Sequence, residues 1–357
     1  MKKLNHYAPI ETPFHSIYLN DWDVLNTILN SKQYSSVFII TDENTAKYCL
    51  HIALENIKTQ CKIITISPGE ENKNIETCLF VWQQLLIHKA DRHALIINLG
   101  GGVTGDLGGF CAATFMRGID FIQVPTTLLS QVDASIGGKV GVDLLHFKNM
   151  IGAFALPKAV FIFTSFLKTL PEKEIQSGLS EIIKHLLIAD RDGFESWNAD
   201  ILKNEALLAA EIYRSVKIKQ KIVELDPNEK GSRKVLNFGH TIGHAIETVS
   251  LLDQKPLLHG EAVAIGMICE SYISYRCGFI SEEEAFKIKE ILIKIFGHHP
   301  KKMMAEDRLL KVMYSDKKNS GGQIRFSLLE GIGKACFDQV VSTDIIKDSL
   351  LFYQQKS

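Results

Sequence analysis

The chain of 357 residues lacks an excess of charge of either sign, because 40 Lys and Arg residues stand against 41 Asp and Glu residues. A chain without a basic excess has no bulk field to attract nucleic acid or an anionic membrane. It also lacks an apolar run of transmembrane length, and its first residues lack the apolar core of a signal peptide. We therefore expect no nucleic-acid partner and no membrane, and any anion must be bound by a local cluster of positive side chains.

Cysteine is sparse and irregular. The seven cysteines are odd in number, scattered along the chain and free of a Cys-x-x-Cys motif. This usage fits reduced thiols in the cytosol better than a disulfide framework, so we predict a cytoplasmic protein. With 46% hydrophobic and 23% charged residues, the composition is typical of a globular protein that buries a sizeable core.

The length exceeds the usual limit of a single core, which favours two domains. Short β-branched apolar runs alternate with amphipathic stretches in the first half, the pattern of a parallel sheet covered by helices. The predicted strands are 37–41, 62–66, 94–99, 121–124 and 160–163, with a crossover helix at 75–88. After residue 171 we predict helices at 175–189, 206–225, 240–252, 260–275, 282–296 and 343–353, and one late strand at 323–328.

The fold expected from these patterns has two parts. The first is an α/β, Rossmann-like domain with a parallel sheet, residues 1–168, and the second is a mainly α-helical domain, residues 169–357. We expect the active site in the cleft between them.

Three histidines lie near carboxylates in the helical half. His240 and His244 are four residues apart, so they share one face of a helix, and His259 follows on the next predicted helix. Neutral imidazole is the commonest protein ligand for zinc-like ions. An isolated pair with this spacing is more often two ordinary surface or core histidines, but the third histidine and the nearby glutamates favour a metal site.

The strand at 94–99 runs into a glycine-rich turn, Gly100-Gly101-Gly102-Val103-Thr104-Gly105, which has the form G-x-G-x-x-G. Such glycines let the backbone approach a pyrophosphate, and the next helix offers unpaired N–H groups to it. The usual fingerprint follows the first strand instead, so an ordinary tight turn is the alternative. Asp42, residues 68–73 and residues 125–127 end neighbouring strands. Because such loops converge, we predict a nucleotide site there.

Together these features resemble the 3-dehydroquinate synthase family of the sugar-phosphate cyclase superfamily. The motifs that carry the resemblance follow one another in family order over most of the chain. They are 68–73, 100–110, 117–118, 125–127, Asp133, 137–143, 148–149, 166–171, 181–184, Arg233, 236–247, 259–261 and 316–318. The stretch between His244 and His259 is slightly longer than the family pattern, which affects a loop and leaves the histidines in place.

The resemblance implies that Glu181, His240 and His259 hold a divalent ion, Zn²⁺ or Co²⁺, with His244 as a proton-handling residue. Local spacing alone favours a different set, because the pair His240 and His244 and the pair Glu181 and His185 are each four apart. Three protein ligands and an open position are what a catalytic metal needs to polarise a substrate hydroxyl.

The resemblance also implies NAD as an oxidant that is recycled within the site. The residues implied to line or border the NAD site are Asp42, Pro68, Gly69, Glu70, Glu71, Asn72, Lys73, Gly102, Val103, Thr104, Gly105, Asp106, Thr126, Thr127, Lys139, Lys148, Phe166, Leu167, Lys168 and Thr169.

The implied activity is that of a carbon–oxygen lyase acting on a phosphate, in the shikimate pathway of aromatic amino acid biosynthesis. The family converts 3-deoxy-D-arabino-heptulosonate 7-phosphate to 3-dehydroquinate and phosphate by transient oxidation, β-elimination, reduction, ring opening and aldol closure. The resemblance places Asn149 and Lys317 at the phosphate, and Asp133 and Asn237 in substrate positioning. The candidates for proton handling and enolate stabilisation are Lys184, Lys219 and His244. Arg233 can pair with the carboxylate, and Lys139 is a further candidate for anion binding. Arg117 is implied to reach the phosphate in a neighbouring subunit's site, which implies a homodimer.

Three other functions stand beside this one. A related cyclase would act on sedoheptulose 7-phosphate or a hexose phosphate, but Arg233 with Lys219 argues for a substrate that bears a carboxylate. A metal-dependent polyol dehydrogenase would release NADH, and the many candidate anion-binding lysines favour the cyclase. A catalytically inactive protein would need a broken metal set, whereas Glu181, His240 and His259 are all present.

Overall fold

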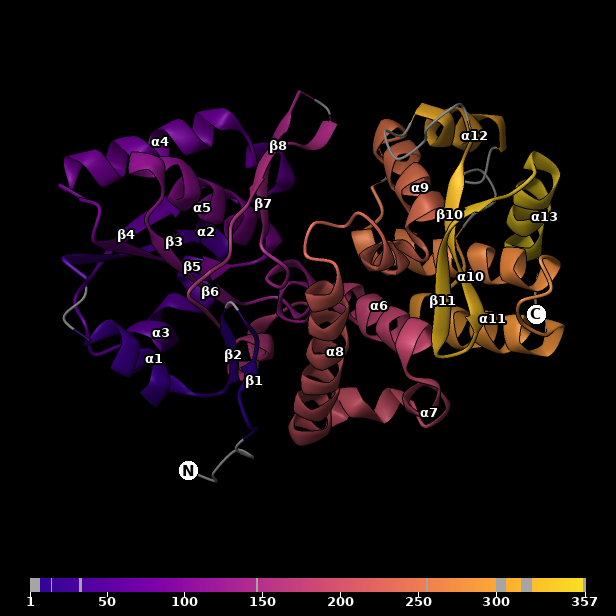
Figure 1. Ribbon diagram of the computed structural model, residues 1–357, viewed down its shortest axis with the longest axis horizontal. Coiled ribbons are helices and arrows are strands. Elements are labelled where there is room, and N and C mark those ends of the chain that lie inside the picture. Colours follow the sequence, from indigo (N-terminus) through magenta and orange to yellow (C-terminus); the bar gives the residue numbers. More distant parts are fainter. Residues whose placement is uncertain are drawn as a thin grey trace. The chain divides into compact units, whose positions relative to one another are not determined.

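The computed structural model describes residues 7–13, 15–31, 34–145, 147–254, 256–299, 306–315 and 323–355. Its contacts divide the chain into two compact units (Figure 1). Unit 1 comprises Met1–Pro171 and Asn204–Gln220, and unit 2 comprises Glu172–Lys203 and Lys221–Ser357. The division into independent domains at residues 168 and 169 stays a prediction. Most of helix α8 (Glu205–Leu225) belongs to unit 1, although it follows the first segment of unit 2 in the sequence.

Unit 1 is built on a seven-stranded sheet in the order β1-β2-β9-β6-β5-β3-β4, parallel except for the edge pair of β1 and β2. Its strands are β1 (Ile10–Glu11), β2 (Ser16–Leu19), β3 (Ser36–Asp42), β4 (Cys61–Ile66), β5 (Ala94–Gly100), β6 (Asp120–Pro125) and β9 (Ala159–Ile162). All five predicted strands are confirmed. The sequence did not reveal β1 and β2, which are too short to show a period, or the separate hairpin of β7 (Lys139–Leu144) and β8 (Phe147–Phe154).

The helices of unit 1 follow these strands. They are α1 (Trp22–Leu29), α2 (Glu43–Tyr48), α3 (Leu50–Asn56), α4 (Ile75–Ile87) and α5 (Gly102–Thr114), with short turns η1 (Glu70–Asn72), η2 (Phe115–Arg117), η3 (Ser130–Ala134) and η4 (Thr164–Thr169). The predicted crossover helix at 75–88 is confirmed as α4.

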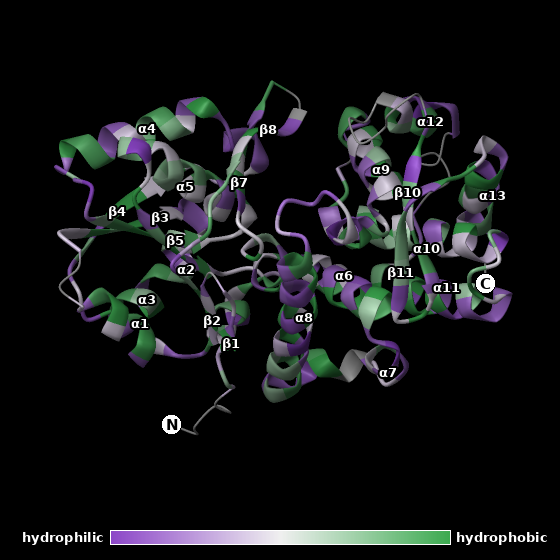
Figure 2. Cartoon of the chain, viewed as in Figure 1, coloured by the Kyte–Doolittle hydropathy of each residue, from purple (hydrophilic) through white to green (hydrophobic). Residues whose placement is uncertain are grey.

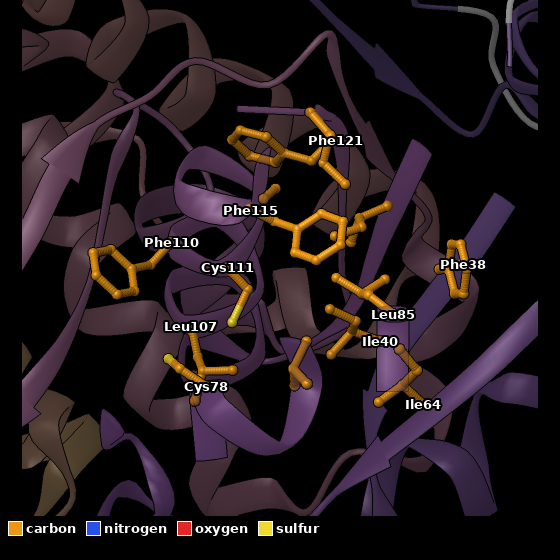
Figure 3. Close-up of a cluster of buried hydrophobic side chains, with 14 of the residues drawn as sticks. Phe38, Ile40, Ile64, Cys78, Leu85, Leu107, Phe110, Cys111, Phe115 and Phe121 are labelled. Atoms are coloured by element: carbon orange, nitrogen blue, oxygen red, sulfur yellow. The ribbon is translucent and has the colours of Figure 1, made fainter. Parts of the chain in front are cut away.

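The central strands are apolar along their whole length because the sheet is covered on both faces. Side chains alternate along a strand, so Phe38 and Ile40 of β3 lie in one core cluster, while Ile39 lies in the other. Figure 3 shows the first cluster, where Phe38 and Ile40 lie with Leu107 of α5. In Figure 2 these central strands are mostly in the apolar colour, whereas α4 carries both colours.

The order of the strands reverses next to β3. The chain passes from β3 outward to β4 and then returns to form β5 on the other side of β3. Open α/β sheets bind ligands at such a switch point, beyond the carboxyl ends of the strands. Here those ends are Asp42 of β3 and Gly100 of β5.

Unit 2 is mainly helical, as predicted. Its elements are α6 (Glu172–Ala189), α7 (Arg191–Glu195), η5 (Ala199–Lys203), η6 (Ser232–Asn237), α9 (His240–Leu252), α10 (His259–Arg276), α11 (Glu282–Phe296), α12 (Glu306–Ser315), β10 (Arg325–Gly331), β11 (Lys334–Val340) and α13 (Thr343–Gln354). Within the described part of the chain, no helix is long and apolar enough to cross a membrane.

The expectation of a single late strand is wrong. Strand β10 pairs with an antiparallel partner, β11, across a turn in which Gly331 and Gly333 have φ of +133° and +84°. The sequence of β11 hides it, because its residues are only partly buried and form no apolar run. Side-chain pattern detects strands that are packed on a core, so a half-exposed hairpin strand escapes it.

Helices α9 and α10 lie in close backbone contact because glycines line their crossing. A Cβ atom on Gly243 of α9 would lie 3.0 Å from the carbonyl oxygen of Ala262 on α10. A Cβ atom on Gly266 of α10 would overlap the carbonyl oxygen of Gly239, the residue that precedes α9 and has φ of +80°. The obstructing atoms are backbone, so they cannot move aside as the tip of a side chain does.

We predict that Gly266→Ala destabilises unit 2 by about 1–3 kcal/mol, the usual cost of overpacking a close-packed core. Equilibrium unfolding in urea measures the change. Gly102→Ala is the matched control, because its added methyl would meet only an ordinary contact at 3.5 Å from Ala134 Cβ. Equal stability of Gly266→Ala and the control would contradict the close approach of the two helices.

Candidate active site

Three side chains of unit 2 converge on one point. Glu181 comes from the middle of α6, and His240 and His259 are the first residues of α9 and α10. Oε1 of Glu181 lies 3.7 Å from Nε2 of His240 and 3.9 Å from Nε2 of His259. One ligand atom of each residue lies within 4.8 Å of those of the other two. The three residues named from the family resemblance are thus brought together.

The rings of both histidines are oriented through their second nitrogen. Nδ1 of His240 lies 3.1 Å from the carbonyl oxygen of Phe238, so this nitrogen carries the proton when it donates there. Nδ1 of His259 lies 3.6 Å from Oε2 of Glu247 on α9. In each case Nε2 is the nitrogen that faces Glu181, as expected of metal-binding histidines held by an outer partner.

His244 stands beside this group rather than in it. Its ring centroid lies 5.1 Å from that of His240 and 5.9 Å from that of His259. Among the described residues, no cluster of candidate ligands contains both His240 and His244. The pair favoured by helical spacing is thus close by ring centroids, but the cluster of candidate ligand atoms that contains His240 is completed by Glu181 and His259.

The three residues fit a divalent cation. Glu181 is fully buried, and its two carboxylate oxygens accept no hydrogen bond from the described residues. A buried carboxylate is costly unless positive charge compensates it, and buried Lys184 on the same helix pairs with one of its oxygens, Oε2, which leaves Oε1 facing the histidines. Two imidazole nitrogens and one carboxylate oxygen form a common ligand set of catalytic zinc sites, which leave a further position open.

Two further predicted residues of unit 2, Arg233 and Asn237, lie on η6. Arg233 is buried, and its Nη1 donates to the carbonyl oxygen of Pro227 at 2.7 Å. Asn237 donates to Oε1 of Glu229 at 3.0 Å and borders a cavity of about 260 Å³. Lys317 lies outside the described residues.

In unit 1 the glycine-rich turn stands at the switch point of the sheet. Oδ1 of Asp42 accepts the N–H groups of Asn44 and Thr45 and so caps α2. Its Oδ2 accepts the hydroxyl of Thr104 on α5 at 3.3 Å. The end of β3 therefore contacts the start of α5, where the N–H groups of the first turn lack helical partners.

Glycine is needed at this turn for space. A Cβ atom on Gly100 would lie 2.5 Å from Thr104, and one on Gly101 would lie 3.2 Å from Thr127. The backbone N–H of Thr126 donates to the carbonyl of Gly100, which closes the loop after β6 onto the loop after β5. The predicted residues Gly102, Val103, Gly105, Thr126 and Thr127 thus share one edge of the sheet.

Lys73 connects several polar side chains at the same edge of the unit 1 sheet. Its buried ammonium group lies 2.7 Å from Oδ2 of Asp106 and donates to Oδ1 of Asn149 at 2.7 Å. Burial alone would lower the pKa of Lys73, but the carboxylates of Asp106 and Glu70 outweigh it and raise the pKa. Glu70 also lies 3.8 Å from Nζ of Lys148. The loop at residues 68–73 is thereby tied to the β8 hairpin.

The remaining predicted cofactor residues differ in exposure. Phe166 and Leu167 of η4 are buried in the core, so only their backbone is placed to reach a ligand. Lys168 and Thr169 are exposed, and Lys168 lies 3.4 Å from Glu205.

Four predicted substrate residues also belong to unit 1. Nζ of Lys219, on α8, lies 2.7 Å from Oδ1 of Asp133, so a buried ammonium group pairs with a partly exposed carboxylate. Lys139 starts β7 and is exposed. Arg117 is exposed as well, and it has φ of +71° next to Met116 at +50°. Two consecutive left-handed residues without glycine are uncommon and mark a constrained backbone.

Two glutamates of unit 2 have a place in this site that the sequence did not reveal. Glu247 faces His259, and Glu270 of α10 accepts backbone N–H groups at the start of α9. The sequence offered one signal for the role of Glu270, which is its charge within an apolar helical segment. An isolated charge in a buried helix needs a partner.

The comparisons with known proteins identify the family of the chain. Family models described as 3-dehydroquinate synthase N-terminal and C-terminal match residues 63–177 and 178–319. The 3-dehydroquinate synthase of Parabacteroides distasonis is 40% identical over 93% of this chain and 95% of its own.

Two solved structures share the fold at a TM-score of 0.84 and 26% identity. One is 2-deoxy-scyllo-inosose synthase complexed with carbaglucose-6-phosphate, NAD⁺ and Co²⁺, matched over 96% of this chain and 99% of that one. The other is 2-epi-5-epi-valiolone synthase from Streptomyces hygroscopicus with NAD⁺ and Zn²⁺, matched over 98% and 99%. On the family models and the identity to its relatives, the chain belongs to the 3-dehydroquinate synthase family.

Proposed function

We propose that this chain converts 3-deoxy-D-arabino-heptulosonate 7-phosphate to 3-dehydroquinate and phosphate, with NAD and Zn²⁺ or Co²⁺ as cofactors. The observation that carries the proposal is the convergence of Glu181, His240 and His259 in a chain that matches this family over nearly its whole length. When bound, NAD accepts and returns a hydride, and the divalent ion acts as a Lewis acid on a substrate hydroxyl.

The residues of unit 2 hold the reacting part of the substrate. Glu181, His240 and His259 would bind the cation through Oε1 and two Nε2 atoms, the atoms that already face one another. Arg233 would bind the carboxylate, because its guanidinium is held at Nη1 by Pro227 and a planar fork matches a carboxylate. Asn237 lies four residues along η6 and would position the substrate.

Three groups are placed to hold or move protons. His244 lies next to both proposed histidine ligands and outside their cluster with Glu181, and we assign its ring the role of an acid or base. Lys184 is fixed by its ion pair with Glu181, and Lys219 is fixed by its pair with Asp133. A fixed ammonium group can stabilise the negative charge that develops on an enolate without reorganising. The departing phosphate is a further proton acceptor.

The residues of unit 1 would hold NAD and the substrate phosphate. The N-terminal turn of α5 presents N–H groups suited to a pyrophosphate, and Asp42 stands beside it for a ribose hydroxyl. Lys139, Asn149 and Lys148 lie on the β7–β8 hairpin, where two ammonium groups would face the substrate phosphate.

The substrate assignment rests on identity within the family. Relatives of 40% identity are 3-dehydroquinate synthases, whereas the cyclases for other sugar phosphates are 26% identical. Arg233 supplies the cation that a carboxylate substrate needs. The free state of all seven cysteines supports a cytoplasmic location. The constrained, exposed Arg117 supports a homodimer in which this residue completes the neighbour's site.

The direct test incubates the metal-loaded protein with NAD and the heptulosonate phosphate while inorganic phosphate and NADH absorbance are followed. We expect phosphate release without accumulation of NADH, because the hydride is returned within each turnover. Accumulating NADH would identify a dehydrogenase instead. Absence of both products with this substrate, but phosphate release from sedoheptulose 7-phosphate, would identify a different cyclase.

Arg233→Ala should weaken binding of the carboxylate substrate by about 1.5–3 kcal/mol, the worth of a hydrogen bond to a charged group. The change appears in the dissociation constant measured by titration calorimetry with the metal-loaded protein. Arg308→Ala is the control, because Arg308 belongs to the same unit and pairs with Asp253 at its surface. Unchanged affinity in Arg233→Ala would remove this residue from the substrate site.

Intersubunit complementation tests the role of Arg117. We expect Arg117→Ala and His259→Ala each to abolish turnover as pure proteins. A heterodimer would keep one complete site, so dissociating and reassociating an equal mixture should restore about a quarter of the wild-type activity. Mixing each variant with itself is the control. If the mixture stays inactive although subunit exchange is demonstrated by native mass spectrometry, Arg117 does not act in the neighbour's site.

A further inference from the structure

Glu270 is a fully buried carboxylate in the middle of α10. Its Oε2 accepts the N–H of Gly239 at 2.6 Å, and its Oε1 accepts the N–H of Ile242 at 3.1 Å. These two N–H groups belong to the residue before α9 and to the third residue of α9, so they flank His240. A carboxylate from another helix therefore caps the start of the helix that opens with a proposed metal ligand.

The contact reaches the imidazole of His240 through a single peptide group. The N–H of Gly239 and the carbonyl of Phe238 belong to the same planar peptide unit. The N–H end of this unit donates to Glu270, and the carbonyl end faces Nδ1 of His240 at 3.1 Å. One hydrogen-bonded line thus runs from the Glu270 carboxylate through the peptide to the ring, and the opposite nitrogen of that ring faces Glu181.

The physical effect of this line is to fix the ring and raise its donor strength. A buried anion polarises the peptide that donates to it, which places more negative charge on the Phe238 carbonyl oxygen. That oxygen then binds the Nδ1 proton of His240 more strongly, so Nε2 carries the lone pair. Carboxylates that contact metal-binding histidines directly have this effect, and here a peptide group stands between.

We infer that Glu270 is a positioning residue of the metal centre, which acts on His240 through the Phe238–Gly239 peptide. The inference rests on the proposed metal site. It gives the two histidines matching supports, since His259 faces the carboxylate of Glu247 directly while His240 faces that of Glu270 through one peptide. A purely structural cap would stabilise α9 without affecting how the folded protein binds a metal ion.

The test replaces Glu270 with glutamine, which keeps the size of the side chain and removes its charge. The amide oxygen can accept only one of the two N–H groups, and the amide NH₂ faces the other. We expect the affinity of the folded variant for Zn²⁺, measured by chelator competition, to fall by about 10- to 100-fold. We also expect the visible absorption bands of the Co²⁺-loaded variant to change, because the geometry at His240 changes.

Ser271→Ala is the matched control. Ser271 is the next residue of α10 and is fully buried, and its hydroxyl makes no hydrogen bond with the described residues. It should bind Zn²⁺ as the wild type does. Circular dichroism establishes the folded fraction of each variant at the temperature of the titration. Glu270→Asp, which keeps the anion on a shorter side chain, should have an affinity between those of the wild type and Glu270→Gln, and it serves if the glutamine variant does not fold.

The results distinguish the role of Glu270 from the existence of the metal centre. If folded Glu270→Gln, or folded Glu270→Asp in its place, binds Zn²⁺ with wild-type affinity and gives the wild-type Co²⁺ spectrum, Glu270 is a helix cap only and the inference is overturned. If the wild-type protein itself binds neither Zn²⁺ nor Co²⁺, the proposed metal centre fails, and the inference fails with it.

Discussion

The buried carboxylate of Glu181 is the constraint on which the rest of unit 2 depends. It lies in the apolar interior of α6, where an uncompensated negative charge would cost several kcal/mol. Lys184 supplies one positive partner from the same helix. The other oxygen of Glu181, Oε1, faces His240 and His259, which is the place for a divalent ion. The arrangement thus leaves one carboxylate oxygen to bind a cation together with the two imidazoles.

The two histidines reach Glu181 because two helices begin at the right place. Glycines allow the backbones of α9 and α10 to approach each other closely. A metal ligand at the first position of a helix can be oriented by the backbone that precedes the helix. His240 is an example, because its Nδ1 faces the carbonyl oxygen of Phe238. Rigid secondary structure with outer hydrogen-bond partners is what a metal centre needs to keep its geometry.

Much of the fold was predictable from the sequence, and less of the site. Strands such as β3 and β5 are apolar on both faces, so their pattern identified them, whereas the half-exposed β11 gave no such signal. Spacing along the helix pointed to His240 with His244. The compact set needs Glu181, which no local rule connects to them, so the family pattern had to supply it. Glu270 contacts backbone N–H groups that lie 31 and 28 residues away in the sequence. No local sequence pattern predicts such a contact.

The most direct test of the central claim is a crystal structure of the Zn²⁺-loaded protein with anomalous diffraction recorded on both sides of the zinc absorption edge. The account predicts one strong anomalous peak at about 2.0–2.2 Å from Oε1 of Glu181 and from Nε2 of both His240 and His259. A peak bound instead by His244 and Glu247, with Glu181 left out of the coordination, would contradict it.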